Sequence, residues 1–77
     1  RGRGVRSATD TRVKILEAAR AVFAARGFDG ARMRAIASKA RVNLALIHYH
    51  FGGKELLYES VIESAFAEIA SSTERVA

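Results

Sequence analysis

The chain has 77 residues, a length that accommodates one domain with a modest hydrophobic core. It contains no cysteine, which excludes disulfides, thiolate catalysis and cysteine-ligated zinc, and it contains no proline, which is compatible with a helical protein. The net charge is +5, but eleven of the thirteen Lys and Arg residues fall within residues 1–41, so the first half presents either a nucleic-acid-binding face or an ordinary solvated surface.

The N-terminal segment predicts an arm followed by a helix. Residues 1–9 are rich in Arg, Gly and Ser, which indicates a disordered basic arm. The run Thr-Asp-Thr at residues 9–11 can cap a helix, and Gly27 is suited to end it, so we predict a helix over residues 10–26. Its apolar side chains recur at three- and four-residue spacing: Ile15, Leu16, Ala19, Val22 and Phe23.

Two short helices are predicted in the middle of the chain, after a loop at residues 28–30. The first lies near residues 32–39, where the apolar side chains share one helical face. These side chains are Met33, Ile36 and Ala37. The segment RVN then leads to the second short helix, near residues 44–50, whose N-terminus Asn43 can cap.

Gly52 and Gly53 break the second short helix, and a longer amphipathic helix is predicted from Lys54 to about residue 71. Its apolar positions are Leu57, Val61, Ile62, Ala65, Phe66 and Ile69. No strand pattern or internal repeat is found. The predicted fold is therefore all-α, a small helical bundle with a helix-turn-helix, that is, three homeodomain-like helices plus the start of a fourth. Because such helix pairs also occur in proteins that never touch DNA, the geometry alone leaves the function open.

The identity of the residues is more specific. The stretch TRVKILEAARAVFAARGFDGARMRAIASKARVNLALIHYHFGGKELLYESVIE, about residues 11–63, resembles the N-terminal DNA-binding domain of the TetR family of transcriptional regulators. The resemblance is carried by ILEAA, RGF, MRAIA, HYHF and KELL, in that order. It implies a sequence-specific DNA-binding domain that in most such proteins represses transcription as a homodimer on a palindromic operator of double-stranded DNA. It also implies a larger C-terminal domain, absent here, that binds a small effector and forms the dimer interface.

The resemblance also implies a domain organisation and a location. Residues 1–9 would form the arm, residues 10–53 the helix-turn-helix domain, and residues 54–77 a helix connecting to the missing domain. A bacterial cytoplasmic, nucleoid-associated protein is expected. No signal peptide is found, and no apolar run approaches the roughly 18 residues of a membrane span, so we expect no membrane partner.

The facing of the second short helix follows from its 100° rotation per residue. Ile47 and Phe51 lie on one side and are predicted to anchor the helix in the core, with Val42 packing under the turn. The small Ala45, together with His48 and Tyr49, then faces outward, where a DNA major groove can admit the helix. Leu44 either contacts a thymine methyl group or is a partly covered leucine at the helix start.

Other contacts are carried over from the family pattern. Tyr49 and His50 match an aromatic ring and a histidine or tyrosine that meet the DNA backbone, although His50 has the alternative of being half-buried and satisfied inside the bundle. Lys54 matches a lysine that reaches a phosphate at the start of the last helix, where backbone N–H groups also favour an anion. The full set of candidate DNA-binding residues is Arg32, Met33, Arg34, Asn43, Leu44, Ala45, His48, Tyr49, His50 and Lys54.

Two positions depart from the family pattern. Arg32 replaces the usual Ser or Thr, so a helix cap is lost and a charge is gained; Arg34 is in its expected place and can meet a phosphate or the edge of a guanine. For both arginines the alternative is a solvated side chain. Arg41 replaces a frequent glycine, so either it is held at positive φ at a cost of roughly 1 kcal/mol or the turn differs. In the arm, Arg1, Arg3 and Arg6 either follow phosphates or a minor groove, or stay disordered.

Rival functions have little support in the sequence. His48 and His50 are two residues apart, so on a helix they point about 200° away from each other and cannot clamp one metal ion. No nucleophile, base and acid set or phosphate-binding glycine loop is found, so we predict neither catalysis nor a cofactor. A protein-interaction module or a membrane-surface helix is the remaining rival, but it gives no reason for the sequence of residues 42–54.

Overall fold

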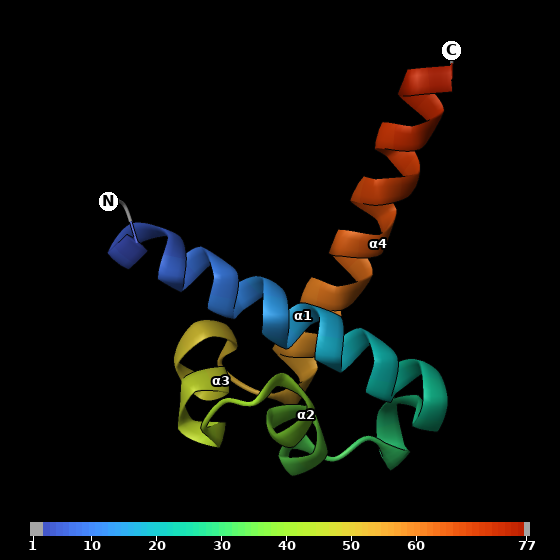
Figure 1. Cartoon of the computed structure of the whole chain (residues 1–77). Coiled ribbons are helices and arrows are strands. Elements are labelled where there is room, and N and C mark those ends of the chain that lie inside the picture. The colour runs from blue at the N-terminus through green and yellow to red at the C-terminus, as the bar shows by residue number, and fades with distance from the viewer. Residues whose placement is uncertain (1–2, 77) are drawn as a thin grey trace.

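The computed structural model describes the backbone of residues 3–76 and the side chains of residues 10–69, and its regular structure there is entirely helical. The helices are α1 (Arg3–Gly30), α2 (Met33–Ala40), α3 (Leu44–Phe51) and α4 (Lys54–Val76). The short helices α2 and α3 lie together on one side of α1, whereas α4 passes α1 and projects away from the bundle (Figure 1). The predicted all-α fold is confirmed.

The first helix begins earlier than predicted. α1 starts at Arg3, so the expected start at residue 10 is corrected, as is the expected disorder of residues 3–9, whose backbone is helical. The segment contains no proline, and extending an existing helix adds a hydrogen bond per residue without a second nucleation cost. Residues 1 and 2 lie outside the described part of the chain, as do the side chains of residues 3–9 and any contact of Arg1, Arg3 or Arg6 with DNA.

Gly27 interrupts α1 where the sequence predicted an end. Its φ of 74° and ψ of 172° are not helical, and this combination is open essentially to glycine alone. The chain then makes one more helical turn to Gly30, and the Ala31 N–H donates to the Gly27 carbonyl oxygen at 3.1 Å. The glycine thus bends the chain away from the axis of α1 and leads it into α2.

Each helix contributes one large side chain to the centre of the core. Ile15 from α1, Ile36 from α2, Ile47 from α3 and Leu57 from α4 are all fully buried. The core is completed by residues that are mostly those of the predicted apolar stripes: Ala18, Ala19, Val22, Phe23, Ala31, Ala37, Ala40, Phe51 and Val61. Both predicted anchors of α3, Ile47 and Phe51, are confirmed.

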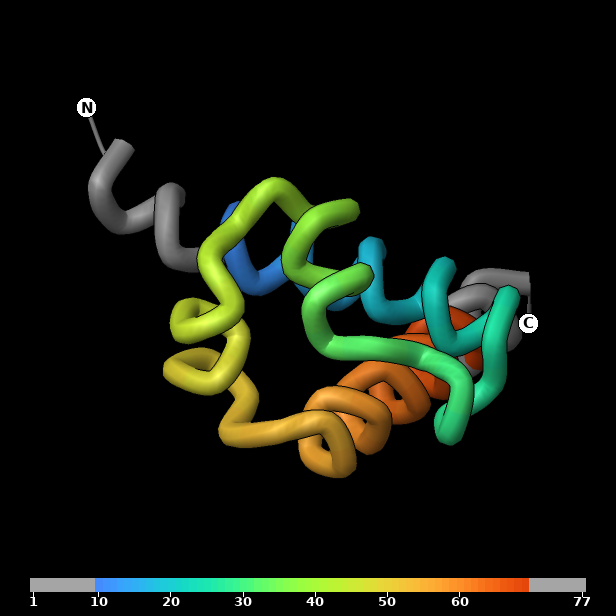
Figure 2. Tube along the Cα trace, turned by 90° about the horizontal axis from the view of Figure 1, so that it is seen from below, coloured from blue at the N-terminus to red at the C-terminus, as the bar shows by residue number. Residues whose placement is uncertain are grey.

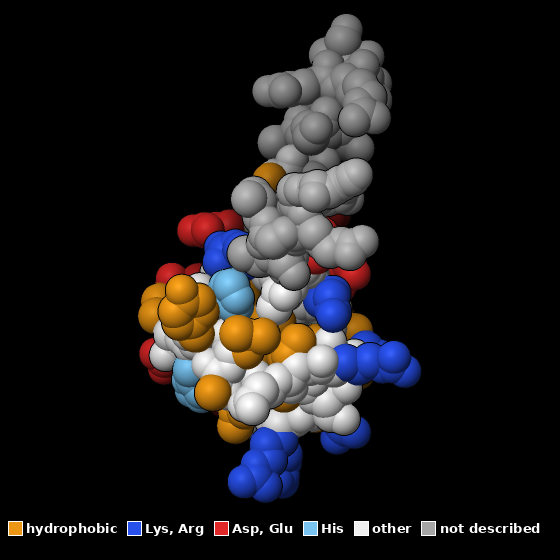
Figure 3. Space-filling view, turned by 60° about the vertical axis from the view of Figure 1, so that its left-hand side comes forward, with side chains coloured by type: hydrophobic (Ala, Val, Ile, Leu, Met, Phe, Trp, Pro, Cys, Tyr) orange, Lys and Arg blue, Asp and Glu red, His pale blue; other side chains and the backbone are white. Residues whose placement is uncertain are grey.

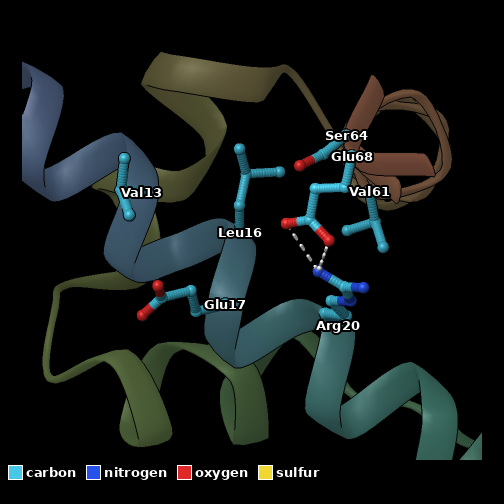
Figure 4. Close-up of a pocket in the computed structure, with 7 residues that line it drawn as sticks. All are labelled: Val13, Leu16, Glu17, Arg20, Val61, Ser64 and Glu68. Atoms are coloured by element: carbon cyan, nitrogen blue, oxygen red, sulfur yellow. Dashed lines mark hydrogen bonds and ion pairs between the residues drawn. The ribbon is translucent and has the colours of Figure 1, made fainter. Parts of the chain in front are cut away.

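α1 and α4 are joined by apolar contact and by one ion pair. Figure 4 shows Leu16 of α1 and Val61 of α4 lining a shallow groove between the helices. At its edge the Arg20 Nη1 donates to both carboxylate oxygens of Glu68 at 3.1 Å. Both side chains are at least half exposed, so the pair contributes at most about 1 kcal/mol to stability. The apolar contact dominates this junction.

The turn between α2 and α3 contains a non-glycine residue in the left-handed backbone conformation that glycine favours. Arg41 has φ 61° and ψ 45°, so the alternative of an arginine at positive φ is confirmed. The Arg41 N–H donates to the Ser38 carbonyl oxygen and the Val42 N–H to that of Ala37, the hydrogen-bond pattern of a Schellman motif. Val42 is half-buried against the core, as predicted.

α4 runs to Val76, beyond the predicted end near residue 71, because no glycine or proline follows Lys54. The burial of its apolar stripe stops earlier. Leu57 and Val61 are buried, whereas Ile62, Phe66 and Ile69 are exposed. The periodicity predicted the helix correctly but not how much of its apolar face the bundle covers.

We expect Ile47→Ala or Phe51→Ala to lower the free energy of unfolding by about 2–5 kcal/mol, because each removes buried apolar volume from the core. Urea denaturation followed by circular dichroism measures the change. His48→Ala, on the exposed side of the same helix, is the control and should stay within about 0.5 kcal/mol of the wild type. A core variant that unfolds at the wild-type urea concentration would contradict the facing of α3.

Arg41→Gly should raise the free energy of unfolding by up to about 1 kcal/mol, because glycine occupies positive φ without the strain of a Cβ atom. The opposite change is available at the end of α3. Gly52 has φ 99°, and a Cβ atom there would lie 2.8 Å from Leu56 Cδ1, so Gly52→Ala should destabilise the protein. Chemical denaturation compares the two variants, and a destabilised Arg41→Gly would contradict the strain at this turn.

Candidate nucleic-acid interface

α3 is fixed at its start by a side-chain cap and in rotation by its buried face. The Asn43 side-chain oxygen accepts a hydrogen bond from the Ala45 N–H at 2.9 Å, which confirms the predicted cap. Ile47 and Phe51 point into the core, so the opposite face of the helix is turned to solvent. Ala45 and His48 are exposed there, as predicted.

Tyr49 is the most exposed large hydrophobic side chain of the described residues, with 81% of its surface accessible. Its ring meets that of His50 edge-on, with centroids 5.1 Å apart. His50 is half-buried, which agrees with the alternative raised from the sequence, and Leu44 is also half-buried and packs against the core. The exposed aromatic ring on this short capped helix provides a large surface for contact with a partner.

The start of α2 adds cationic side chains. Arg32 is the N-cap residue and makes no side-chain cap hydrogen bond, as expected from the loss of a hydroxyl at this position. Arg32 and Arg34 are both exposed, while Met33 between them is half-buried and packs against the core. The methionine therefore anchors the segment and the arginines extend from it.

Lys54 stands at the first position of α4, where the chain emerges from the glycine turn. Its ammonium lies 4.6 Å from the centroid of the Phe28 ring, a cation–π contact that holds the charge beside the helix N-terminus. The Leu57 N–H donates to the Gly53 carbonyl oxygen at 2.8 Å, so the N–H groups of the preceding residues have no acceptor within the helix. The Lys54 ammonium and the backbone N–H groups therefore place positive charge at this end of α4, next to the Glu55 carboxylate of the first turn.

Sequence reasoning missed the aromatic cluster that supports Lys54. Phe28 and Tyr58 meet edge-on at 5.0 Å, and Phe23 meets Tyr58 at 4.9 Å, which ties the end of α1 to the start of α4. Phe28 lay within the family pattern at RGF, but no role was predicted for it because its partners Lys54 and Tyr58 lie 26 and 30 residues further on. Only the fold brings them together.

Sequence reasoning also missed Arg12. Its Nη1 donates to the His50 carbonyl oxygen at 3.4 Å, and its guanidinium carbon lies 4.5 Å from the centroid of the Phe51 ring. The available signal was its position one helical turn before Ile15 and Leu16, which places its stem beside the apolar face of α1.

The charges of the bundle are unevenly distributed, although α1 carries both signs. The basic side chains include exposed residues at the N-cap of α2, within α2 and in the turn after it: Arg32, Arg34, Lys39 and Arg41. The acidic side chains Glu55, Glu59, Glu63 and Glu68 lie along α4. Figure 3 shows Lys, Arg, His and hydrophobic side chains sharing one face, with acidic side chains at its upper and left-hand margins. This face suits a polyanion that also presents apolar surface.

None of the ten predicted site residues is buried. They lie at the start of α2, at the N-cap of α3 and along that helix, and at the start of α4. Figure 2 shows how α2, α3 and the start of α4 follow one another around the end of the bundle. Within the described residues, no group of three His, Cys, Asp or Glu side chains is arranged to hold a metal ion. Nor does any described helix have the length and apolarity needed to cross a membrane.

Comparison with known proteins agrees with this geometry. Residues 15–61 match the family described as bacterial regulatory proteins, tetR family. The chain is 46% identical over 66 residues to the HTH-type transcriptional repressor NicS of Pseudomonas putida, covering 83% of this chain and 31% of that protein. It is 44% identical over 62 residues to the HTH-type transcriptional repressor SCO4008 of Streptomyces coelicolor, covering 80% and 32%.

A solved structure shows the same fold. The crystal structure of a mutant form of HlyIIR superposes with a TM-score of 0.73 at 40% identity, covering 74% of this chain and 32% of that one. The chain thus spans about a third of the length of the relatives it matches.

Proposed function

Because the chain belongs to the tetR family of bacterial regulatory proteins, we propose that it binds a specific DNA sequence through α3 and that the intact protein is a transcriptional repressor. The observation that carries the proposal is the exposed face of α3, with Tyr49 81% accessible opposite the buried Ile47. The names of the relatives, which are transcriptional repressors and regulators, support the regulatory role.

Base reading is assigned to the outer face of α3 and to the start of α2. A B-DNA major groove about 12 Å wide admits one helix, and the small side chain of Ala45 lets the α3 backbone approach the bases closely. His48 offers a ring nitrogen to a base edge, and the accessible part of Leu44 fits a thymine methyl group. Arg34 fits the O6 and N7 atoms of guanine with its two parallel donors. Asn43 and Met33 flank these contacts from the start of each helix.

Phosphate binding is assigned to the flanking donors. Tyr49 and His50 donate from the end of α3, Lys54 and the adjacent N–H groups donate from the start of α4, and Arg32 donates from the start of α2. Such contacts fix the register of the protein and supply most of its affinity, while base contacts supply specificity. The exposed cations and the helix end fit this role, since each can release counterions from the DNA.

For the intact protein we propose a homodimer on a palindromic operator, released by a small effector. In this organisation α1 from residue 10, α2 and α3 form a DNA-binding part that ends at Gly53. α4 leads from it to a further domain that dimerises and binds the effector. The exposed Ile62 and Phe66 on α4 support a covering partner in the intact protein. A DNA-binding regulator of bacteria acts in the cytoplasm at the nucleoid.

The proposal is tested by NMR titration of the 77-residue chain with a mixed-sequence duplex at about 50 mM and 200 mM salt, a range over which phosphate-driven binding weakens strongly. Amide shifts should move at residues 32–34, 43–50 and 54 and should shrink as salt rises. Shifts that are absent, or that fall elsewhere on the described surface, would refute DNA reading by α3 and favour a protein-interaction role.

Tyr49→Ala and Lys54→Ala should each weaken DNA binding by about threefold to tenfold, since each removes one phosphate donor. Lys54→Ala should also reduce the slope of log affinity against log salt by about 0.9. Fluorescence anisotropy measures the affinity, and circular dichroism should show wild-type helical content in both variants. Arg26→Ala removes the same charge from an exposed position near the C-terminal end of α1, outside the candidate site residues, and is the control for net charge. Equal effects from Arg26→Ala and Lys54→Ala would contradict a specific role for Lys54.

A further inference from the structure

The C-terminal end of α3 depends on a side chain from another helix. The last carbonyl groups of a helix have no backbone N–H donor within that helix. In α3 the His48 carbonyl oxygen receives the Gly52 N–H at 2.9 Å. The His50 carbonyl oxygen receives Arg12 Nη1 from α1, at 3.4 Å, and the same guanidinium lies over the Phe51 ring.

We propose that Arg12 is a positioning residue for DNA reading, which holds the C-terminal end of α3 and with it the orientation of Tyr49 and His50. The inference rests on the proposed function, because it concerns the same face of α3. A cation is favourable at the negative end of a helix dipole. When it also donates to a terminal carbonyl oxygen and lies over an adjacent ring, two separate contacts restrain that end of the helix. Arginine suits this role because its planar group can donate and stack at once.

The rest of the packing explains why this contact matters. α1 packs mainly against α2 and α4, and α3 packs against those same two helices. Arg12 therefore supplies a direct link between the longest helix of the bundle and the reading helix. α3 has eight residues, too few to be stable by itself, so its geometry is set from outside. Asn43 fixes its first turn, Ile47 and Phe51 fix its rotation, and Arg12 fixes its last turn.

Arg12 is exposed, so a direct contact with a DNA phosphate is the competing role. The two roles differ in what they predict without DNA. A positioning residue alters α3 in the free protein, whereas a phosphate donor does not. They also differ in salt dependence, since only a phosphate contact contributes about 0.9 to the slope of log affinity against log salt.

The test compares Arg12→Ala, Arg12→Lys and the control Lys14→Ala, which removes an equal charge from an exposed position on α1. Amide hydrogen exchange on the free chain should be about threefold to tenfold faster at residues 49–52 in Arg12→Ala, with the amides of α2 unchanged. Affinity for the mixed-sequence duplex should fall by a similar factor with an unchanged salt slope. Arg12→Lys should recover part of both effects, and Lys14→Ala should show no change in exchange at residues 49–52.

Three results would overturn the inference. Wild-type exchange at residues 49–52 in Arg12→Ala, with a reduced salt slope, would make Arg12 a phosphate donor. Faster exchange throughout the bundle would make it a contributor to global stability only. Wild-type exchange and affinity together would deny it any role while leaving the proposed function intact. Failure of the wild-type chain to bind DNA is a separate outcome, which refutes the proposed function and the inference with it.

Discussion

The burial of four aliphatic side chains in one core holds this domain together. Ile15, Ile36, Ile47 and Leu57 come one from each helix, and none retains accessible surface. Helices of eight residues are unstable in water, so α2 and α3 exist because their apolar faces are buried against α1 and α4. The same burial fixes the rotation of α3 about its own axis. What the helix presents to solvent is therefore decided by what it buries.

The candidate interface is built outward from that core by contacts between elements distant in sequence. Lys54 of α4 rests on Phe28, and Arg12 of α1 rests on Phe51. Each pair places a cation against a ring that is itself packed on the core, so the positions of two charges near α3 are fixed relative to the bundle. Long cationic side chains lose rotamer freedom when they bind a phosphate, and a side chain already held against a ring has less to lose.

The sequence predicted the elements and which side chains of α3 are exposed or buried, because both depend on local patterns. Three-residue and four-residue spacing located every helix and the buried faces of α1, α2 and α3, and Asn43 and Arg41 behaved as their local chemistry required. Two kinds of feature escaped. The start of α1 and the end of α4 were misplaced because helix extension needs no special residue, and Arg12 and Phe28 were missed because their partners lie far away in the chain.

The mismatch between pattern and burial on α4 carries information of its own. An apolar stripe continues from Leu57 to Ile69, yet the bundle covers it only as far as Val61. Exposed Ile62 and Phe66 on one projecting helix form surface of the kind that proteins cover with a partner. On the proposed function that partner is the effector-binding domain. α4 packs on both α1 and α3, and Arg12 joins α1 to α3. A displacement of α4 imposed at its exposed end would therefore reach α3 by two routes. One is the direct contact between α4 and α3, and the other passes through α1 and Arg12. Both routes end at the residues proposed to read DNA.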